Sequence, residues 1–247
     1  MGKNKKISVI IAAAGTSSRF GKEISKQFVL LDNKPLLIHS LEKFSLLENA
    51  VEIVVVTNDT ERTKELLKEK CFLDDVKIKI FPGGNLRQDS VYNGFNEVDK
   101  SVDLVLIHDV ARPLFDLKDV KRCIEEANIS GAAILVTPVV DTIKKSRLNK
   151  DKLIVENTLD RNFLYQVQTP QVFSYSLLSE AYKNFRSSAD LIKVATDEAI
   201  MIEHLGKDVN LVIGSRNNIK ITFPEDLEIA LSILKNAKKV KNELCLN

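Results

Sequence analysis

Short apolar segments alternate with charged segments of helical spacing along most of this chain. Leu37, Leu41 and Phe44 fall on one face of a helix, and Glu52 to Val56 then has the pattern of a buried strand. Strand–helix–strand units of this kind predict an α/β fold with a mostly parallel sheet flanked by helices. The expected elements are strands at 52–56, 76–81, 102–107 and 132–136, and helices near 60–70, 87–98 and 117–127.

The first strand begins at Ile7 and runs into a loop of small residues that ends at Gly15. Alanine and glycine at a strand end let the backbone approach a ligand closely, and successive backbone amides can then face an anion. Arg19 and Lys26 follow, and their side chains could add full positive charges to the same anion. We therefore expect this loop to hold the phosphates of a nucleoside triphosphate.

Two common phosphate-binding motifs do not fit this loop. A dinucleotide fingerprint needs a second glycine two positions after Gly15, where Ser17 stands. A Walker loop needs four residues between its glycines and a hydroxyl after its lysine, but five residues separate Gly15 from Gly21, and Glu23 follows Lys22. The pattern argues against NAD binding and against a P-loop.

Composition limits the class of protein. A chain of 247 residues with 44% hydrophobic and 28% charged residues is expected to form a single domain spanning 1–247. Its net charge of +2 gives no reason to expect nucleic-acid or membrane binding. Cys71, Cys123 and Cys245 are too scattered for a disulfide framework or a metal site, so a cytoplasmic location is expected.

Between residues 139 and 163 the pattern changes to short charged strands around Lys144 to Lys152. We interpret this segment as a β-arm that protrudes from the domain. An isolated hairpin needs something to pack against, and a second subunit would supply it. A surface loop is the alternative interpretation.

A glycine pair, Gly83 and Gly84, follows the strand at 76–81 and precedes polar residues up to Ser90. Backbone groups of Gly84 and Asn85 could contact the edge of a pyrimidine base. An ordinary turn between a strand and a capped helix would have the same sequence, so both interpretations stay open.

Charged residues also follow the strand at 102–107, namely His108, Asp109 and Arg112. Asp109 could hold Mg²⁺ or orient a polyol hydroxyl, and Arg112 could bind a phosphate in a bidentate manner. The alternative is an internal ion pair. For His108 a structural hydrogen bond is favoured over catalysis.

Three polar segments lie further along the chain. Residues 168–171 are expected to form a turn, and Thr196 is expected to cap a helix whose N-terminus Asp197 and Glu198 favour electrostatically. Lys220 lies on a short apolar strand and faces opposite to its neighbours, which would point it into the cleft.

Taken together, these motifs resemble the 2-C-methyl-D-erythritol 4-phosphate cytidylyltransferase family. The resemblance covers Ile7 to about Leu234, and the matching segments are 12–15 with Arg19 and Lys26, 83–90, 108–113, 168–171, 196–199 and 218–220. It implies a Rossmann-like fold of the nucleotide-diphospho-sugar transferase type. It also implies a Mg²⁺-dependent, homodimeric enzyme that joins CTP and 2-C-methyl-D-erythritol 4-phosphate, releasing pyrophosphate, in non-mevalonate isoprenoid synthesis.

The family pattern also implies roles for residues of this chain. Those expected to bind CTP are Ala13, Ala14, Gly15, Arg19, Lys26, Gly84, Asn85, Ser90 and Lys220, of which Arg19, Lys26 and Lys220 would be catalytic. Those expected to bind methylerythritol phosphate are Asp109, Arg112, Thr142, Arg161 and Thr169. In the family the arm crosses to the partner subunit, so Thr142 and Arg161 would act in the partner's site. Mg²⁺ would be held by phosphates, with Asp109 as its possible protein ligand.

Two other functions remain as alternatives. A ribitol 5-phosphate cytidylyltransferase would share several of the same motifs, although residues 158–161 and 196–199 favour the methylerythritol branch. A regulatory protein could keep the CTP pocket without turnover, but the full set of cationic residues argues against it. Ser17 and Ser25 stand where family members often carry glycine and proline, and Asn85 stands where a relative can carry aspartate.

Overall fold

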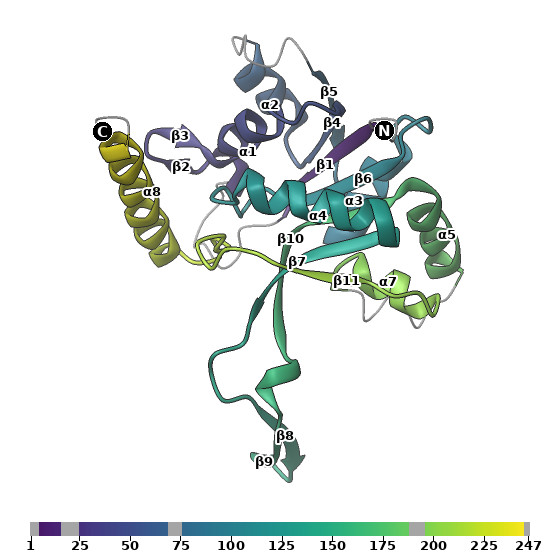
Figure 1. Ribbon diagram of the computed structural model, residues 1–247, viewed down its shortest axis with the longest axis vertical. Coiled ribbons are helices and arrows are strands. Elements are labelled where there is room, and N and C mark those ends of the chain that lie inside the picture. Colours follow the sequence, from purple (N-terminus) through teal and green to yellow (C-terminus); the bar gives the residue numbers. More distant parts are fainter. Residues whose placement is uncertain (1–4, 16–24, 69–75, 188–195, 245–247) are drawn as a thin grey trace.

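The computed structural model describes residues 5–15, 25–68, 76–187 and 196–244. A seven-stranded sheet lies at its centre (Figure 1). All neighbouring strands in the sheet are parallel except β10, which runs antiparallel to both β6 and β7, so the predicted mostly parallel sheet is confirmed. The spatial order is β11 (Asn210–Ile213), β7 (Ala132–Pro138), β10 (Tyr165–Ser174), β6 (Leu104–Asp109), β1 (Ile7–Ala13), β4 (Ala50–Thr57) and β5 (Lys77–Pro82).

Helices cover both faces of the sheet, because successive side chains of its strands point to opposite sides. Val9 and Ile11 of β1 belong to one buried cluster, and Ile10 belongs to the other. The first cluster packs against α1 (Leu36–Phe44), α2 (Thr60–Leu67), α4 (Leu117–Ser130) and α8 (Glu225–Leu244). The second packs against α3 (Arg87–Asn96), α5 (Tyr175–Arg186) and α7 (Ala199–His204). The result is a three-layer α/β fold.

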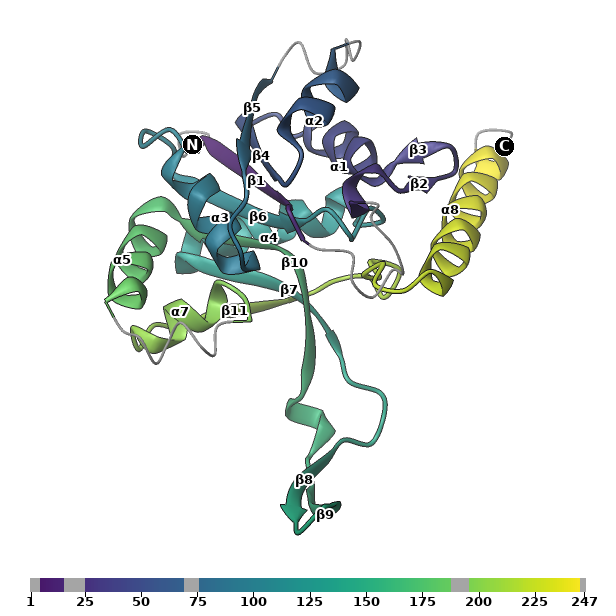
Figure 2. The same ribbon diagram turned by 180° about the vertical axis from the view of Figure 1, so that it is seen from behind.

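Smaller elements complete the domain beside α1. A 3₁₀ turn, η2 (Lys26–Phe28), leads into a hairpin of β2 (Leu30–Leu31) and β3 (Lys34–Pro35). The hairpin lies next to α8 (Figure 2). Within the described part of the chain, no helix is both long enough and apolar enough to span a bilayer.

The segment between β7 and β10 forms the expected β-arm. Strands β8 (Lys144–Asn149) and β9 (Lys152–Thr158) pair as an antiparallel hairpin, and a 3₁₀ turn, η4 (Arg161–Phe163), leads back to the sheet. Figures 1 and 2 show the arm projecting away from the three layers. The apolar side chains Leu148, Leu153 and Phe163 are 70%, 75% and 81% exposed. The chain therefore builds a hairpin here rather than a surface loop, and the hairpin leaves apolar side chains uncovered.

Two local predictions are wrong. Residues 168–171 do not form a turn, because they continue β10 through a shift in its pairing with β7 between Val167 and Gln171. Pro170 lies in this shift, where its missing N–H removes a donor from the ladder. Lys220 does not lie on a strand, because residues 218–222 have no regular secondary structure and the backbone N–H of Ile221 donates to the carbonyl of Ala111 at 2.8 Å.

Candidate functional site

The loops after β1, β5 and β6 line one cavity of about 350 Å³ at the carboxyl ends of these strands. This is where parallel α/β sheets bind their ligands. The predicted site residues that line the cavity are Ala13, Ala14, Gly15, Lys26, Gly84, Asn85, Ser90, Asp109 and Lys220. Arg19 lies outside the described residues. We call this space the nucleotide cavity.

The glycine pair lets two of these loops touch. A Cβ atom on Gly83 would lie 2.2 Å from the Cβ of Ala14, and one on Gly84 would lie 2.4 Å from the Cβ of Asp89. The hydroxyl of Ser90 accepts from the Gly84 N–H at 3.0 Å and donates to the Leu86 carbonyl at 3.0 Å. Ser90 therefore holds the loop that forms one wall of the nucleotide cavity.

A second cavity of about 200 Å³ adjoins the first, because Arg87, Asp109 and Lys220 line both. It also includes the predicted residues Arg112 and Thr169. We call it the acceptor cavity, since a second substrate held there would lie next to the contents of the nucleotide cavity.

Asp109 lies at the junction of the two cavities, at the end of β6. One carboxylate oxygen accepts from Nε of Arg87 at 2.9 Å, and the other accepts from Nζ of Lys220 at 2.7 Å. Burial alone would raise the pKa of Asp109, but the cations of Arg87 and Lys220 outweigh burial and hold that pKa well below its usual range. Asp109 is thus a fixed negative charge, and within the described part of the chain it pairs with Arg87 and Lys220 instead of with Arg112.

Arg87 and Glu198 are residues that the sequence interpretation did not assign to the site. The Arg87 Nη1 donates to both oxygens of Glu198, at 3.1 and 3.0 Å, while Nε contacts Asp109. Burial raises the pKa of the fully buried Glu198, and Arg87 opposes this shift. No pattern of neighbouring residues in the sequence could identify this pair, because Arg87 begins α3 and Glu198 comes 111 residues later, just before α7.

Thr169 and His108 fix the backbone beside Asp109. The hydroxyl of Thr169 accepts from the Asp109 N–H at 3.0 Å and lies 3.1 Å from Nδ1 of His108. Nε2 of His108 lies 3.1 Å from the carbonyl of Arg112, so the assigned tautomer carries its proton on Nε2 and accepts the Thr169 hydroxyl at Nδ1. Burial lowers the pKa of His108 to about 3. His108 therefore makes the structural hydrogen bonds expected of it.

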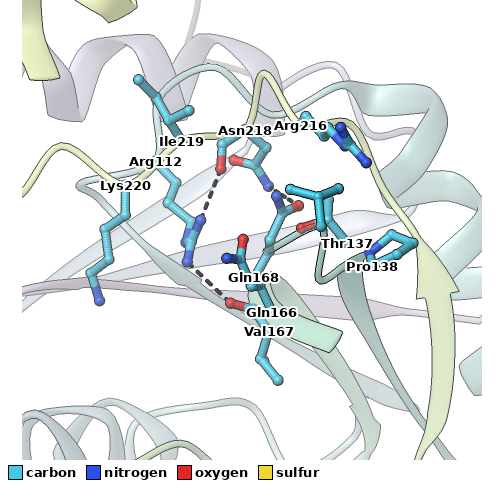
Figure 3. A pocket seen from close by; sticks show the side chains of 11 residues that line it. Arg112, Thr137, Pro138, Gln166, Val167, Gln168, Arg216, Asn218, Ile219 and Lys220 are labelled. Carbon is cyan, nitrogen blue, oxygen red and sulfur yellow. Dashed lines mark hydrogen bonds between the residues drawn. The ribbon is translucent and has the colours of Figure 1, made fainter. Parts of the chain in front are cut away.

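The segment that carries Lys220 is held by polar contacts of Asn218 instead of by a strand ladder (Figure 3). Arg112 donates to the carbonyls of Asn218 at 2.8 Å and Val167 at 3.2 Å. The buried side-chain amide of Asn218 donates to Gln168 and to the backbone of Thr169. Arg112, Gln168 and Asn218 line a third cavity of about 420 Å³ at the base of the β-arm. Figure 3 shows the bonds of Arg112 and the bond between Asn218 and Gln168 along its wall. Segment 218–220 is thereby fastened to β10.

Lys26 ties the same C-terminal segment to η2. Its ammonium group donates to the carbonyls of Ile221 and Thr222, each at 3.2 Å. Lys26 and Lys220 therefore approach the nucleotide cavity from two segments that contact each other, although they lie far apart in the sequence.

The predicted cap of α7 is wrong in one detail. Helix α7 begins after Glu198, and the Asp197 carboxylate, rather than Thr196, accepts from the N–H of Ile200 at 3.3 Å. Asp197 also accepts from the side chain of Gln171 at 2.8 Å. Thr196 instead lines the acceptor cavity with Asp197.

Thr142 and Arg161 lie on the β-arm and are not among the residues that line the two cavities of their own chain. Both side chains are exposed. Arg161 donates to the carbonyl of Val140 at 2.7 Å, a contact between the two sides of the arm. A single chain thus keeps these two predicted acceptor-binding residues outside its own cavities.

A metal ion would find few ligands from the protein. Among the described residues, no cluster of three or more histidine, cysteine, aspartate or glutamate side chains could hold one. Asp109 is the one carboxylate among the described residues that line the nucleotide cavity. Each of its oxygens accepts one bond from a described side chain, and a carboxylate oxygen can accept two. This set fits Mg²⁺ only if substrate phosphates provide most of its ligands, as is usual for that ion.

Comparison with known proteins gives consistent similarities. The family model described as 2-C-methyl-D-erythritol 4-phosphate cytidylyltransferase matches residues 7–236. A curated protein of that name from Alkaliphilus metalliredigens is 40% identical over 94% of this chain and 95% of its own. A second curated protein of that name, from Clostridium botulinum strain Langeland, is 42% identical over 95% of this chain and 99% of its own length.

Solved structures agree with the sequence comparison. The 4-diphosphocytidyl-2C-methyl-D-erythritol synthase of Anaerococcus prevotii matches with a TM-score of 0.80 and 28% identity, covering 94% of this chain and 97% of that one. The 2-C-methyl-D-erythritol 4-phosphate cytidylyltransferase of Thermus thermophilus matches with a TM-score of 0.71 and 31% identity. The match covers 93% of this chain and 99% of that one.

The neutral state of His108 predicts a pH dependence of stability. Between pH 6.5 and 5 the unfolded chain gains a proton that the folded His108 does not, so the free energy of unfolding falls as pH falls. We expect His108→Gln to flatten this slope by about 1 kcal/mol per pH unit, measured by urea unfolding at several pH values. Part of the slope should remain, because burial also lowers the pKa of His39. Parallel slopes for the variant and the wild type would contradict the assignment.

Proposed function

The chain belongs to the 2-C-methyl-D-erythritol 4-phosphate cytidylyltransferase family, and on this basis we propose how its two joined cavities divide the reaction. The enzyme transfers CMP from CTP to 2-C-methyl-D-erythritol 4-phosphate and releases pyrophosphate. CTP occupies the nucleotide cavity, and methylerythritol phosphate occupies the acceptor cavity. The observation that carries this division is the sharing of Asp109 and Lys220 by both cavities.

CTP is oriented by the two ends of its cavity. The loop held by Ser90 offers backbone groups of Gly84 and Asn85 to cytosine, a base whose edge carries both donors and acceptors. The triphosphate lies along Ala13 to Gly15, where small side chains leave the backbone accessible. Lys26 and Lys220 contribute positive charge there, and Arg19 is the further cation that the family pattern assigns.

The chemistry requires alignment and charge neutralisation more than a protein nucleophile. A phosphate oxygen of the acceptor attacks the α-phosphorus of CTP, a new P–O bond forms, and the bond to the β-phosphate oxygen breaks. Lys220 lies at the junction where the negative charge accumulates, and Asp109 keeps its ammonium group there before substrates bind. Mg²⁺, held mainly by phosphates with Asp109 as the candidate protein ligand, would supply further charge neutralisation.

In the acceptor cavity, Arg112 and Thr169 are the proposed contacts for methylerythritol phosphate. Both side chains already bond to the protein, Arg112 through two carbonyls and Thr169 through Asp109 and His108. These bonds fix the positions of both groups before the substrate arrives, which limits the entropy lost on binding.

The β-arm supplies the rest of the acceptor site from a second copy. Leu148, Leu153 and Phe163 are exposed on it, and a two-stranded hairpin has little stability unless it packs against something. We place the arm of one subunit against its partner in a homodimer. Thr142 and Arg161 then complete the acceptor cavity of the neighbouring subunit, which explains their distance from their own cavities. A cytoplasmic location stays a prediction.

The acceptor is tested by pyrophosphate release from the purified protein with Mg²⁺ and CTP. We expect turnover with methylerythritol phosphate to exceed turnover with ribitol 5-phosphate and with no acceptor. A preference for ribitol 5-phosphate would move the protein to the branch that serves polyol-phosphate polymers. Binding of CTP with no turnover of either acceptor would support the regulatory alternative.

A variant ties this activity to the described site. Lys220→Ala should lower kcat by roughly 10²- to 10³-fold, the usual effect of removing one group that stabilises transition-state charge. Lys121→Ala, at an exposed position on α4, is the matched control and should leave kcat unchanged. Equal activity in the two variants would exclude Lys220 from the reaction.

Sharing of sites is tested by mixing two inactive variants, Arg161→Ala and Lys26→Ala. In a mixed dimer one site combines an intact Lys26 with an intact Arg161 from the partner. Random mixing should therefore restore about a quarter of wild-type activity, since half of the dimers are mixed and each has one intact site.

A second mixture controls for this result. Arg161→Ala mixed with Thr142→Ala leaves every site with one defective arm, so it should show no recovery. If verified mixed dimers of the first pair also recover nothing, the arm does not serve the neighbouring site.

A further inference from the structure

Arg87 joins the buried interior to the junction of the two cavities. It begins α3, and its side chain contacts carboxylates from two other parts of the fold, Asp109 at the end of β6 and Glu198 just before α7. The four groups Glu198, Arg87, Asp109 and Lys220 form a row of alternating charge. The inner end of the row is fully buried, and the outer end, Lys220, is 43% exposed at its side chain.

Each contact in this row limits the movement of the next group. Glu198 accepts two bonds from a single nitrogen of Arg87, so the guanidinium group is anchored on one side. Nε of Arg87 then occupies one oxygen of Asp109, which leaves the other oxygen for Lys220. Because the guanidinium group is planar and rigid, these bonds fix the orientation of the Asp109 carboxylate.

Lys220 needs this support because its own backbone belongs to no helix or strand. A lysine side chain is flexible and gains a defined position only through a partner. For Lys220 this partner is Asp109, whose carboxylate accepts a hydrogen bond from Nζ at 2.7 Å. Arg87 in turn holds the carboxylate of Asp109 through its Nε.

We propose that Arg87 is a positioning residue for cytidylyl transfer, which acts through Asp109 to hold the ammonium group of Lys220 at the junction of the nucleotide and acceptor cavities. Glu198 is the anchor of Arg87. This role rests on the proposed function, because a fixed position of Lys220 matters only if its ammonium group stabilises the charge that develops in the transfer reaction. It differs from direct substrate binding, since the Arg87 side chain acts through a protein carboxylate.

A double-mutant cycle separates these roles. We expect Arg87→Gln to lower kcat by tenfold or more with a smaller change in the KM for CTP. Arg87→Lys, which keeps the charge, should recover part of the loss. In an Asp109→Asn background, Arg87→Gln should cause no further loss beyond about twofold, because its route to Lys220 is already broken.

Two outcomes of the cycle would overturn the proposal. If the losses from Arg87→Gln and Asp109→Asn multiply in the double variant, Arg87 acts independently of Asp109. If Arg87→Gln lowers only the temperature of unfolding and leaves kcat unchanged, its role is structural. Arg122→Gln is the matched control, because Arg122 also pairs with an aspartate, Asp119, but on the surface of α4.

A second measurement does not depend on turnover. The rate of reductive methylation of Lys220, followed by mass spectrometry without nucleotide, should rise in Arg87→Gln and Glu198→Gln as Lys220 is released, and should not change in Arg122→Gln. An unchanged rate in the first two variants would contradict the proposal even if the wild type showed no cytidylyltransferase activity. Absence of wild-type activity would count against the proposed function alone.

Discussion

The candidate site depends on the ion pairs made by the buried carboxylate of Asp109. A charged group taken out of water is tolerated only when its partners compensate for the lost hydration. Here Arg87 and Lys220 do so from two different parts of the chain. The strand that ends at Asp109, the start of α3 and the irregular segment at 218–220 are therefore brought to one point by a single side chain.

The fold makes this convergence possible. Parallel strands β1, β4, β5 and β6 all end at the same edge of the sheet, so the loops that follow them meet there. The antiparallel strand β10 adds Thr169 from the opposite direction, next to Asp109. Phosphoryl transfer demands positioned charge more than reactive side chains, and a rigid sheet edge with fixed ion pairs meets that demand.

Much of this arrangement was predictable from local sequence. Apolar runs identified the parallel strands, small residues marked the loop after β1, and the charged residues that end β6 pointed to a site. The ion pair of Lys220 with Asp109 and that of Arg87 with Glu198 were not predictable, because each joins residues 111 positions apart. Residues 168–171 were interpreted as a turn since proline and polar residues favour one. Sheet pairing on either side of this segment, up to Val167 and again from Gln171, instead keeps the strand continuous.

The structure of the protein with CTP and Mg²⁺ bound tests the central claim most directly. We predict cytosine against the Gly84 to Ser90 loop, the triphosphate along Ala13 to Gly15, and the ammonium group of Lys220 between Asp109 and the phosphates. CTP bound elsewhere, or bound in the nucleotide cavity with Lys220 turned away from both Asp109 and the phosphates, would contradict the account.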